Sequence, residues 1–431
     1  MKHALVLGGN VSGQSAARLL ATLGMRVTVY DARPLDPSHF NDDVTFELGE
    51  WRQNVLDDID LVVTSPGFAP ASPPIGTVLE RGVRLWGEIE LAMRHIELPV
   101  AAITGTNGKT TVTEMTAAML QAAGINAPAA GNIGSPLADL VGTHFDAVVL
   151  EVSSFQLFYT ETFHPQVAVV LNVAPDHLDW HGTLEHYADA KARIFQQQGP
   201  GDILVFSADD QGARDLAARA GSRLVGVSGI GLPPGGAGPQ ADEMVLPTGT
   251  IPLRDLSRHD PVFLVDLAAA AVAAHELGAG HDAISEIGRS FVPGNHRRSL
   301  VGSWDGVAWV NDSKASNPHA AVAAIKAYAS VILIAGGRNK GLDLSEVPTA
   351  GNVRHLIAIG ESADELIAAA QAVPFSRAGS MRDAVAIADS IAAPGDTVLL
   401  SPGCASFDMF SSYIERGDVF AAEVRALKEA A

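Results

Sequence analysis

The sequence contains little cysteine, few aromatic residues and no long apolar run. Its single cysteine, Cys404, cannot form a disulfide within the chain, which is typical of proteins from a reducing cytosol. The longest apolar run, residues 267–274, is far shorter than the roughly 20 residues of a membrane-spanning helix. The apolar run at residues 4–7 is too short for the core of a signal peptide. We therefore expect a cytoplasmic protein without membrane insertion.

Positive charge is also in deficit. Lys and Arg number 29 and Asp and Glu number 49, so the formal net charge is −20. This excess of negative charge argues against nonspecific binding to nucleic acid or to an anionic membrane surface, although a local loop can still bind an anionic substrate. With 47% hydrophobic and 18% charged residues the chain is globular, and 431 residues are too many for one ordinary core.

Short apolar runs alternate with helix-length segments along the chain, which is typical of parallel sheets covered by helices. The runs fall into three groups: residues 4–7, 27–30, 61–63 and 83–85; residues 99–103, 147–150 and 167–171; and residues 307–310, 331–335, 356–359 and 397–400. Residues 226–242 are rich in Gly and Pro and predict a surface loop. We predict an α/β fold of three domains with mainly parallel sheets, over residues 1–92, 93–293 and 294–431.

The strongest chemical signal lies between the strand at residues 99–103 and a helical pattern. It is the glycine-rich segment Gly105, Thr106, Asn107, Gly108, Lys109, Thr110 and Thr111. Glycines let the backbone approach phosphate oxygens, and the N-terminus of the following helix attracts anions. Lys109 would neutralise the outer phosphates and the Thr110 hydroxyl would hold Mg²⁺. The first glycine of the usual phosphate loop is replaced by Ile103, so a glycine-rich turn with a surface lysine is the alternative.

Acidic and histidine side chains follow two further strands. Glu151 comes directly after residues 147–150, and Asp176-His177-Leu178-Asp179 follows residues 167–171. Ligands of open α/β sheets gather at the carboxyl ends of strands, and Mg²⁺ prefers oxygen ligands. Taken singly, Glu151 also fits a helix cap and His177 a polar loop residue. Together with the glycine-rich segment they predict a nucleotide–metal site.

These motifs resemble those of the Mur ligase family along almost the whole chain. The resemblance is carried by ITGTNGKTTV, Gly131-Asn132-Ile133-Gly134, Glu151-Val152-Ser153-Ser154-Phe155-Gln156-Leu157, DHLDWHG, Asn311-Asp312-Ser313-Lys314 and SPGCASFDMF…RGDVF. It is greatest to the branch that adds D-glutamate to UDP-N-acetylmuramoyl-L-alanine in peptidoglycan precursor synthesis. The resemblance implies that ATP phosphorylates the substrate carboxylate and that an amine then attacks the acyl phosphate. It also implies two Mg²⁺ ions.

Residue by residue, the resemblance implies a catalytic set of Lys109, Glu151, His177, Lys191 and Lys314. Thr110 and Glu151 would serve the first Mg²⁺, and His177 and Lys191 the second, with Asn132 and His177 near the UDP substrate. A protonated lysine cannot bind a cation. The resemblance implies a carbamylated Lys191, whereas the residue pattern alone favours a lysine on a helix surface.

In the last third of the chain the resemblance assigns Arg297, with its neighbour His296, and Asp312 to ATP. Ser316, Lys340, Ser406 and Tyr413 match positions that bind the incoming D-glutamate. A cation such as Lys340 suits an amino acid with two carboxylates. The alternatives are a solvated loop charge for Lys340 and a core position for Tyr413.

The first glycines resemble a dinucleotide-binding fingerprint, with Asp31 lying 31 − 8 = 23 residues after Gly8. Asn10 replaces the glycine that lets the pyrophosphate approach. In the resembling family this fold binds the UDP part of the substrate instead. We therefore expect contacts to UDP from Val11, Ser12, Asp31, Arg33, Ser65 and Gly67.

Three alternatives are compatible with parts of this pattern. A sister ligase that adds another amino acid and a folylpolyglutamate synthase would share the phosphate loop, and a non-catalytic nucleotide-binding protein would keep it without turnover. The family's usual asparagines around adenine are missing from residues 258–268, where the sequence reads RHDPVFLVDLA. We expect a monomer that takes UDP-N-acetylmuramoyl-L-alanine and D-glutamate as substrates.

Overall fold

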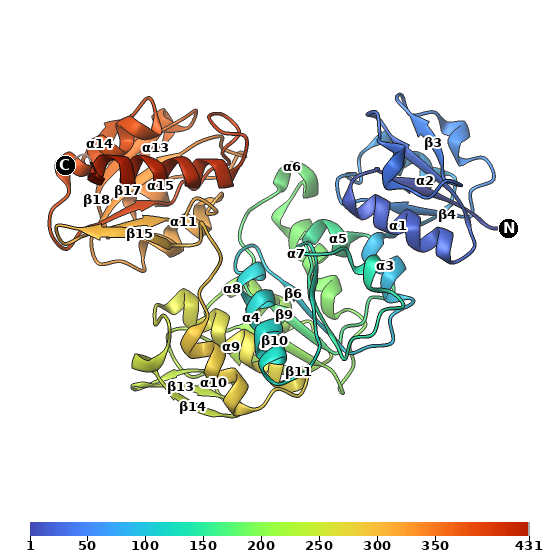
Figure 1. Cartoon of the computed structure of the whole chain (residues 1–431), viewed down its shortest axis with the longest axis horizontal. Helices are drawn as coiled ribbons and strands as arrows, with labels where there is room; N and C mark the ends of the chain where they lie inside the picture. Colours follow the sequence, from blue (N-terminus) through green and yellow to red (C-terminus); the bar gives the residue numbers. More distant parts are fainter. Residues whose placement is uncertain (430–431) are drawn as a thin grey trace. The chain divides into compact units, whose positions relative to one another are not determined.

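The predicted apolar runs form strands in a computed structural model that describes residues 1–429 (Figure 1). The first four runs and an unpredicted edge strand, β3, build a five-stranded parallel sheet. Its strand order is β3 (Thr45–Leu48), β2 (Arg26–Asp31), β1 (His3–Leu7), β4 (Leu61–Thr64) and β5 (Arg84–Gly87). Its helices are α1 (Val11–Thr22), α2 (Pro73–Glu80) and α3 (Glu88–Met93). The central strands β1 and β4 are buried throughout except for His3 at the start of β1, which explains their continuous apolar sequence.

A second parallel sheet has six strands. Their order is β11 (Arg223–Val227), β10 (Ile203–Ser207), β9 (Val167–Val170), β6 (Val100–Thr104), β8 (Val148–Glu151) and β7 (Ala129–Gly131). The helices that follow these strands and complete this part are α4 (Lys109–Ala122), α5 (Ser154–Phe158), α6 (Leu178–His181), α7 (Leu184–Ala192), α8 (Gln211–Ala217), α9 (Pro261–Glu276) and α10 (His281–Ser290). The longest apolar run of the sequence, residues 267–274, forms the buried middle of α9.

The sequence predicted a surface loop over residues 226–242. In the structure these residues are not entirely a loop. They include β12 (Gly238–Gln240), which pairs antiparallel with β13 (Glu243–Leu246), and β13 pairs with β14 (Gly249–Pro252). A Cβ on Gly238 would lie 2.4 Å from the carbonyl oxygen of Gly231, so this strand needs glycine because of close backbone approach rather than for flexibility. The spacing of apolar residues in the sequence does not indicate that these two backbone segments lie so close together.

The last part of the chain forms a six-stranded sheet in the order β15 (Ser299–Trp304), β16 (Val307–Asn311), β20 (Thr397–Leu400), β17 (Val331–Gly336), β18 (Val353–Ile359) and β19 (Phe375–Arg377). Only the edge strand β15 is antiparallel to its neighbour. The helices are α11 (Pro318–Ile325), α12 (Glu346–Thr349), α13 (Ala363–Ala369), α14 (Met381–Ile391) and α15 (Tyr413–Glu429). Both faces of this sheet are covered by apolar clusters, as a parallel sheet requires.

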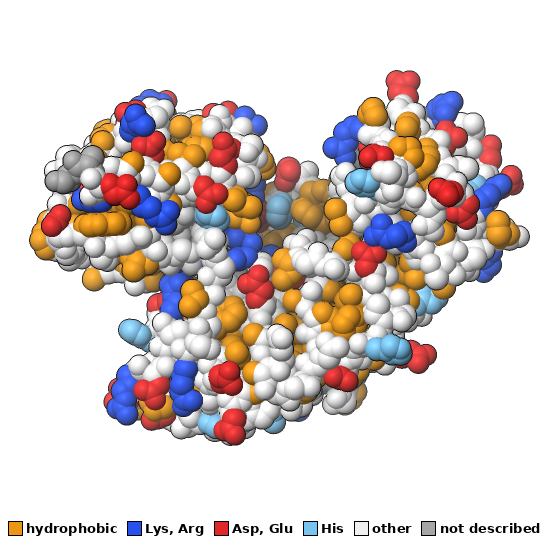
Figure 2. Space-filling view, viewed as in Figure 1, with side chains coloured by type: hydrophobic (Ala, Val, Ile, Leu, Met, Phe, Trp, Pro, Cys, Tyr) orange, Lys and Arg blue, Asp and Glu red, His pale blue; other side chains and the backbone are white. Residues whose placement is uncertain are grey.

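The chain divides into two compact units. The first holds the first three sheets, and the second holds the last sheet together with two short segments, Ala174–Asp179 and Asp260–Val262. Within residues 1–429, none of the helices combines the length and apolar character needed to cross a bilayer. Basic and acidic side chains are interspersed over the face shown in Figure 2.

One carboxyl group inside the first unit gives a pH prediction. Glu88 begins α3, is 4% exposed, and accepts a 2.6 Å hydrogen bond at Oε1 from the backbone N–H of Ala138. Its other oxygen is buried without a hydrogen-bond partner. Burial raises the pKa of Glu88 to about 7. The unfolded chain therefore binds fewer protons than the folded chain between the ordinary pKa and pH 7, and stability falls as pH rises through that window.

We expect Glu88→Gln to remove this loss of stability at high pH, which amounts to at most about 3 kcal/mol in the free energy of unfolding. The variant should raise the midpoint of thermal unfolding more at pH 8 than at pH 5, measured by circular dichroism. Glu346→Gln, at an exposed ion pair with Lys326, is the matched control. An equal shift at both pH values would contradict a protonated Glu88.

Candidate functional site

The predicted site residues stand at the carboxyl ends of the parallel strands in each of the three large sheets. Asp31 ends β2, Glu151 ends β8, and Asp312 follows β16. Most of the other predicted residues lie in the loops that follow strands or in the first helix turns after those loops, whereas Lys191 lies on α7 and Arg297 precedes β15. Open α/β sheets bind their ligands at these ends.

The glycine-rich segment forms the loop between β6 and α4. A Cβ on Gly105 would lie 3.0 Å from both the Asn107 carbonyl oxygen and the Leu171 Cβ. Gly108 has φ +86°, and a Cβ there would lie 2.9 Å from Oδ1 of the buried Asp266. A side chain would be strained at Gly108 and tightly packed at Gly105, and α4 begins immediately after them at Lys109. The loop has the local structure of a phosphate site at a helix N-terminus.

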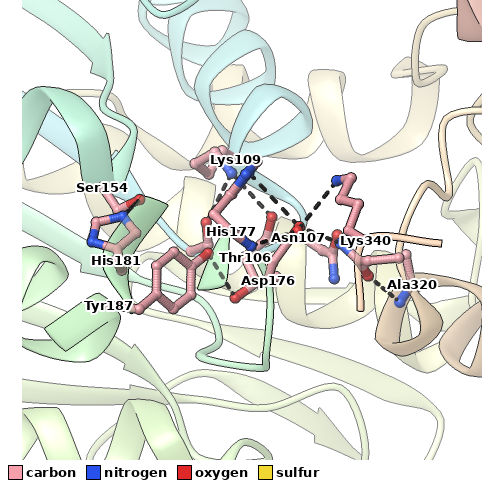
Figure 3. A network of polar contacts seen from close by, with 12 residues as sticks. Thr106, Asn107, Lys109, Ser154, Asp176, His177, His181, Tyr187, Ala320 and Lys340 are labelled. Carbon is pink, nitrogen blue, oxygen red and sulfur yellow. Dashed lines mark hydrogen bonds and ion pairs between the residues drawn. The ribbon is translucent and has the colours of Figure 1, made fainter. Parts of the chain in front are cut away.

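Two lysine side chains converge on this loop, and Figure 3 shows one of them, Lys109, beside Thr106. The Nζ atoms of Lys109 and Lys191 each donate to the Gly105 carbonyl oxygen at 2.8 Å, and Lys109 also donates to the Thr106 carbonyl oxygen at 3.0 Å. Tyr187 donates to the Thr106 hydroxyl at 3.2 Å, and its ring centre lies 4.4 Å from the Lys191 Nζ. Lys191 is only 1% exposed, so the alternative of a surface lysine is wrong.

Glu151 has one satisfied and one unsatisfied oxygen. Oε1 accepts from Nδ2 of Asn132 at 2.8 Å, whereas Oε2 is buried without a hydrogen-bond partner. The residue is 2% exposed at the end of β8, and the capping box of α5 is formed by Ser153 instead, so the helix-cap alternative is wrong. A buried carboxylate oxygen without a donor favours a cation beside it.

This geometry fits Mg²⁺ in part. Glu151 supplies an oxygen of the kind that Mg²⁺ prefers, and the Thr110 hydroxyl is a second candidate on the first turn of α4. Within residues 1–429, no three His, Cys, Asp or Glu side chains gather as a ready-made metal site. Mg²⁺ commonly completes its shell with water and substrate phosphate rather than with an all-protein cage.

In the second unit, Asp176 organises the segment that carries His177 (Figure 3). Its carboxylate accepts from Lys340 Nζ at 3.2 Å, from Asn317 Nδ2 at 3.0 Å and from the His177 backbone N–H at 2.9 Å. Burial by itself would raise the pKa of Asp176, but the Lys340 ammonium, the neighbouring His177 and these hydrogen bonds lower it overall. Lys340 is therefore an ion-paired residue and not a solvated loop charge.

Asp312 is held by residues that the sequence patterns did not identify. Its Oδ1 accepts from the Arg298 backbone N–H at 3.0 Å, and its Oδ2 accepts from the Ser401 hydroxyl at 2.8 Å. The Arg298 side chain forms an ion pair with Asp260. Burial alone would lower the pKa of Arg298, but Asp260 raises it overall. Asp260 lies in residues 258–268, whereas Arg298 directly follows the predicted Arg297, which is half-buried.

The predicted amino-acid residues lie in loops that meet at one end of the last sheet. Tyr413 begins α15 half-buried, and its ring centre lies 5.5 Å from the Lys314 Nζ, while Ser406 is buried and Ser316 half-buried. Arg416, also buried, donates to the Ser313 hydroxyl at 2.9 Å and to the Ser313 and Cys404 carbonyl oxygens at 2.8 and 3.0 Å. It thereby joins the loop that follows β16 to the loop that follows β20.

Six of the predicted UDP residues lie at the carboxyl end of the first sheet, whereas Asn132 follows β7 and His177 follows β9. Asp31 is 5% exposed and accepts from the backbone N–H groups of Gly9 and Arg33, both at 3.0 Å. Burial by itself would raise the pKa of Asp31, but these hydrogen bonds lower it overall. Ser65 donates to the Gly8 carbonyl oxygen at 3.4 Å, and Val11 and Ser12 form the first turn of α1. Val11 is largely exposed, as is Gly67.

Two residues beside the phosphate loop were given no role in the sequence analysis. Asp266 lies on α9 against Gly108, and Asn172 follows β9 and bonds to Asn107. Asp266 stands in an apolar helical run, and Asn172 is an isolated polar residue after a strand. The only available signal was the general expectation of polar residues at strand ends.

The family models and the curated relatives that match this chain all point to one family. Three family models match: the MurD-like N-terminal domain of Mur ligases over residues 2–87, the Mur ligase middle domain over 103–234, and the Mur ligase glutamate ligase domain over 296–404. A curated UDP-N-acetylmuramoylalanine–D-glutamate ligase of Frankia casuarinae is 44% identical over 98% of this chain and 93% of its own length. The enzyme of the same name from Pelotomaculum thermopropionicum is 39% identical over 99% and 98%.

Solved structures agree in fold. The crystal structure of MurF from Acinetobacter baumannii matches with a TM-score of 0.63 and 16% identity, covering 98% of this chain and 90% of that one. At this identity the likeness concerns the fold alone, and the sequence relatives carry the assignment. Because they are similar along nearly the whole chain, this protein belongs to the Mur ligase family.

Proposed function

We propose that this protein is an ATP-dependent, ADP-producing ligase that joins D-glutamate to UDP-N-acetylmuramoyl-L-alanine, a step in peptidoglycan precursor synthesis. The curated relatives at 44% and 39% identity carry this activity in their names. The structural observation that carries the proposal is the phosphate loop beside the buried, unpartnered oxygen of Glu151. Ile103 on β6 pairs in register with Glu151 on β8, and Gly105 follows two residues later.

The proposed chemistry begins with the carboxylate of the UDP-linked substrate. One of its oxygens attacks the γ-phosphorus of ATP, ADP leaves, and an acyl phosphate forms. The D-glutamate amine then attacks the acyl carbon, inorganic phosphate leaves, the nitrogen loses a proton, and an amide remains. Bringing the two anions together requires positive charge, because positioning and electrostatics dominate phosphoryl transfer. Lys109 supplies such charge at the loop.

Mg²⁺ would supply further neutralisation of the phosphate oxygens. In the proposal Thr110 and Glu151 hold one ion, and His177 with a carbamylated Lys191 holds a second. The unpartnered oxygen of Glu151 supports the first ion. The buried position of Lys191 beside the Gly105 carbonyl supports a special role for that lysine.

The proposal also assigns residues that bind ATP, the amino acid and the UDP part of the acceptor. Asp312 and Arg297 would bind ATP, and Lys314 would lie near the reacting groups. The amino acid would contact Ser316, Lys340, Ser406 and Tyr413, and the UDP part would contact the end of the first sheet and Asn132. We also propose a monomer with domain boundaries near residues 92 and 293. The first sheet ends at Gly87, the second begins at Val100, and the second unit resumes at Val292, which supports these boundaries.

The direct test is ADP release measured across a panel of UDP-muramoyl acceptors and D- and L-amino acids. We expect turnover that depends on UDP-N-acetylmuramoyl-L-alanine and D-glutamate together. A sister ligase would prefer another amino acid, and a folylpolyglutamate synthase would require a pterin substrate. ATP binding without turnover under all of these conditions would indicate a non-catalytic nucleotide-binding protein and overturn the proposal.

Carbamylation of Lys191 gives a separate prediction. A carbamate keeps one N–H, which can still donate to the Gly105 carbonyl, and it replaces the ammonium by an anion that can bind metal. Enzyme equilibrated with ¹³C-bicarbonate should show a carbamate carbon by NMR that disappears in Lys191→Ala. Lys326→Ala, at an exposed ion pair, should keep the signal. An identical spectrum for wild type and Lys191→Ala would refute the modification.

A further inference from the structure

The phosphate loop is held by the side-chain amide of Asn172, which bonds to both the backbone N–H and the backbone carbonyl of Asn107. The backbone N–H of Asn107 donates to Oδ1 of Asn172 at 2.8 Å, and Nδ2 of Asn172 donates to the carbonyl oxygen of Asn107 at 3.2 Å. The residue before Asn107 is held too, because the backbone N–H of Thr106 donates to the backbone oxygen of Asn172 at 2.9 Å. Three hydrogen bonds therefore join one residue at the end of β9 to the loop.

This pairing depends on the chemistry of asparagine. Its side chain presents a carbonyl acceptor and an NH₂ donor in a single plane, matching the backbone N–H and the backbone C=O of one residue. Aspartate keeps the acceptors and loses the donor, and alanine loses both. The residue before it also shapes the loop, since a Cβ on Gly105 would lie 3.0 Å from Leu171 Cβ and one on Gly108 would lie 3.0 Å from Leu171 Cδ1. Leu171 therefore packs against the glycines of the loop, and Asn172 forms hydrogen bonds to its backbone.

The contact also determines which loop groups face a ligand. The N–H of Asn107 already donates to Asn172. The N-terminus of α4 is the natural place for an anion, because the first backbone N–H groups of a helix point outward along its axis. Holding the loop in this shape before nucleotide arrives avoids an ordering cost on binding.

We infer that Asn172 is a positioning residue that holds the phosphate loop in its nucleotide-binding shape through the backbone of Asn107. The inference rests on the proposed function, since it takes the ligand of the loop to be ATP. Asn172 reaches the loop through hydrogen bonds to backbone groups, so its effect should fall on nucleotide binding and phosphoryl transfer. The UDP part of the acceptor substrate is proposed to bind mainly at the end of the first sheet, and Asn172 contacts none of the residues proposed for it, so its binding should change little.

The test compares Asn172→Ala and Asn172→Asp with wild type. ADP affinity is measured by calorimetry with Mg²⁺, and the KM values for ATP and for UDP-N-acetylmuramoyl-L-alanine are measured by ADP release. We expect Asn172→Ala to weaken ADP binding about tenfold, which corresponds to the loss of one to two net hydrogen bonds. Asn172→Asp should weaken it at least as much, because a carboxylate oxygen would then face the Asn107 carbonyl. The KM for the UDP substrate should stay within twofold.

Asn126→Ala is the matched control, since Asn126 is exposed and its amide also donates to a backbone carbonyl, that of His144. It should match wild type in every measurement. Thermal unfolding of each variant separates a structural role from a positioning role. A lower unfolding midpoint with unchanged ADP affinity, or loss of folding in both Asn172 variants, would overturn the inference. Absence of ADP binding and of turnover in wild type would instead overturn the proposed function.

Discussion

Replacing Lys109 with methionine is expected to lower turnover by on the order of 10²-fold or more, as does loss of other preorganised charged groups at reaction centres. Lys109 begins α4, and its ammonium lies over the loop carbonyls of Gly105 and Thr106. These are neutral acceptors that a phosphate oxygen can replace. Methionine keeps the apolar stem that packs in this half-buried position and removes only the charge, so the fold should persist.

Steady-state ADP release with saturating substrates measures this effect, with circular dichroism as the check on folding. Lys326→Met is the matched control, because Lys326 forms an exposed ion pair with Glu346 and should tolerate the same change. A Lys109→Met enzyme with near-normal turnover would remove the phosphate loop from the reaction. A drop of the same size in the control would indicate a nonspecific effect of lost charge.

Replacing Glu151 with glutamine should also reduce turnover by on the order of 10²-fold, because a neutral amide interacts far more weakly with a divalent cation than a carboxylate does. The change is nearly isosteric. The amide oxygen can still accept from Asn132, and the NH₂ group takes the place of the unpartnered oxygen. An unpaired buried carboxylate oxygen is costly in a folded protein, so the variant should be at least as stable as wild type.

The measurement is turnover as a function of free Mg²⁺, together with the midpoint of thermal unfolding. We expect the concentration of Mg²⁺ at half-maximal turnover to rise in Glu151→Gln and the unfolding midpoint to be unchanged or higher. Glu346→Gln, at a surface ion pair, should leave both values as in wild type. A Glu151→Gln enzyme with wild-type turnover and Mg²⁺ dependence would show that this carboxylate does not serve the metal.

The strands that the sequence predicts share one physical feature. Residues 4–7, 61–63 and 331–335 are central strands of parallel sheets, buried on both faces, and their sequences are continuously apolar. The strands that the sequence analysis missed lie mostly at edges or in the small antiparallel sheet. Thr45–Leu48 and Phe375–Arg377 are edge strands with polar or exposed residues, so they lack that signal.

The candidate site divides in a similar way. Gly105, Gly108 and Lys109 could be predicted because a loop that binds phosphate needs those residue types in that order. Glu151 could be predicted from its place after a strand. The hydrogen bonds between Asn172 and Asn107 could not be predicted, since the two residues are 65 positions apart. They meet only because β9 pairs with β6. The same holds for Asp176 and Lys340, which are 164 positions apart.

The sequence by itself determined the class of fold, the phosphate loop and the family resemblance, because each depends on residues that are close along the chain. Only the tertiary structure decided which oxygen of Glu151 lacks a partner, that Lys191 is buried, and that Asp176 pairs with Lys340. Burial and hydrogen bonding depend on which strand ends are brought together. Sheet pairing between distant segments sets those neighbours, and no local pattern of residues encodes them.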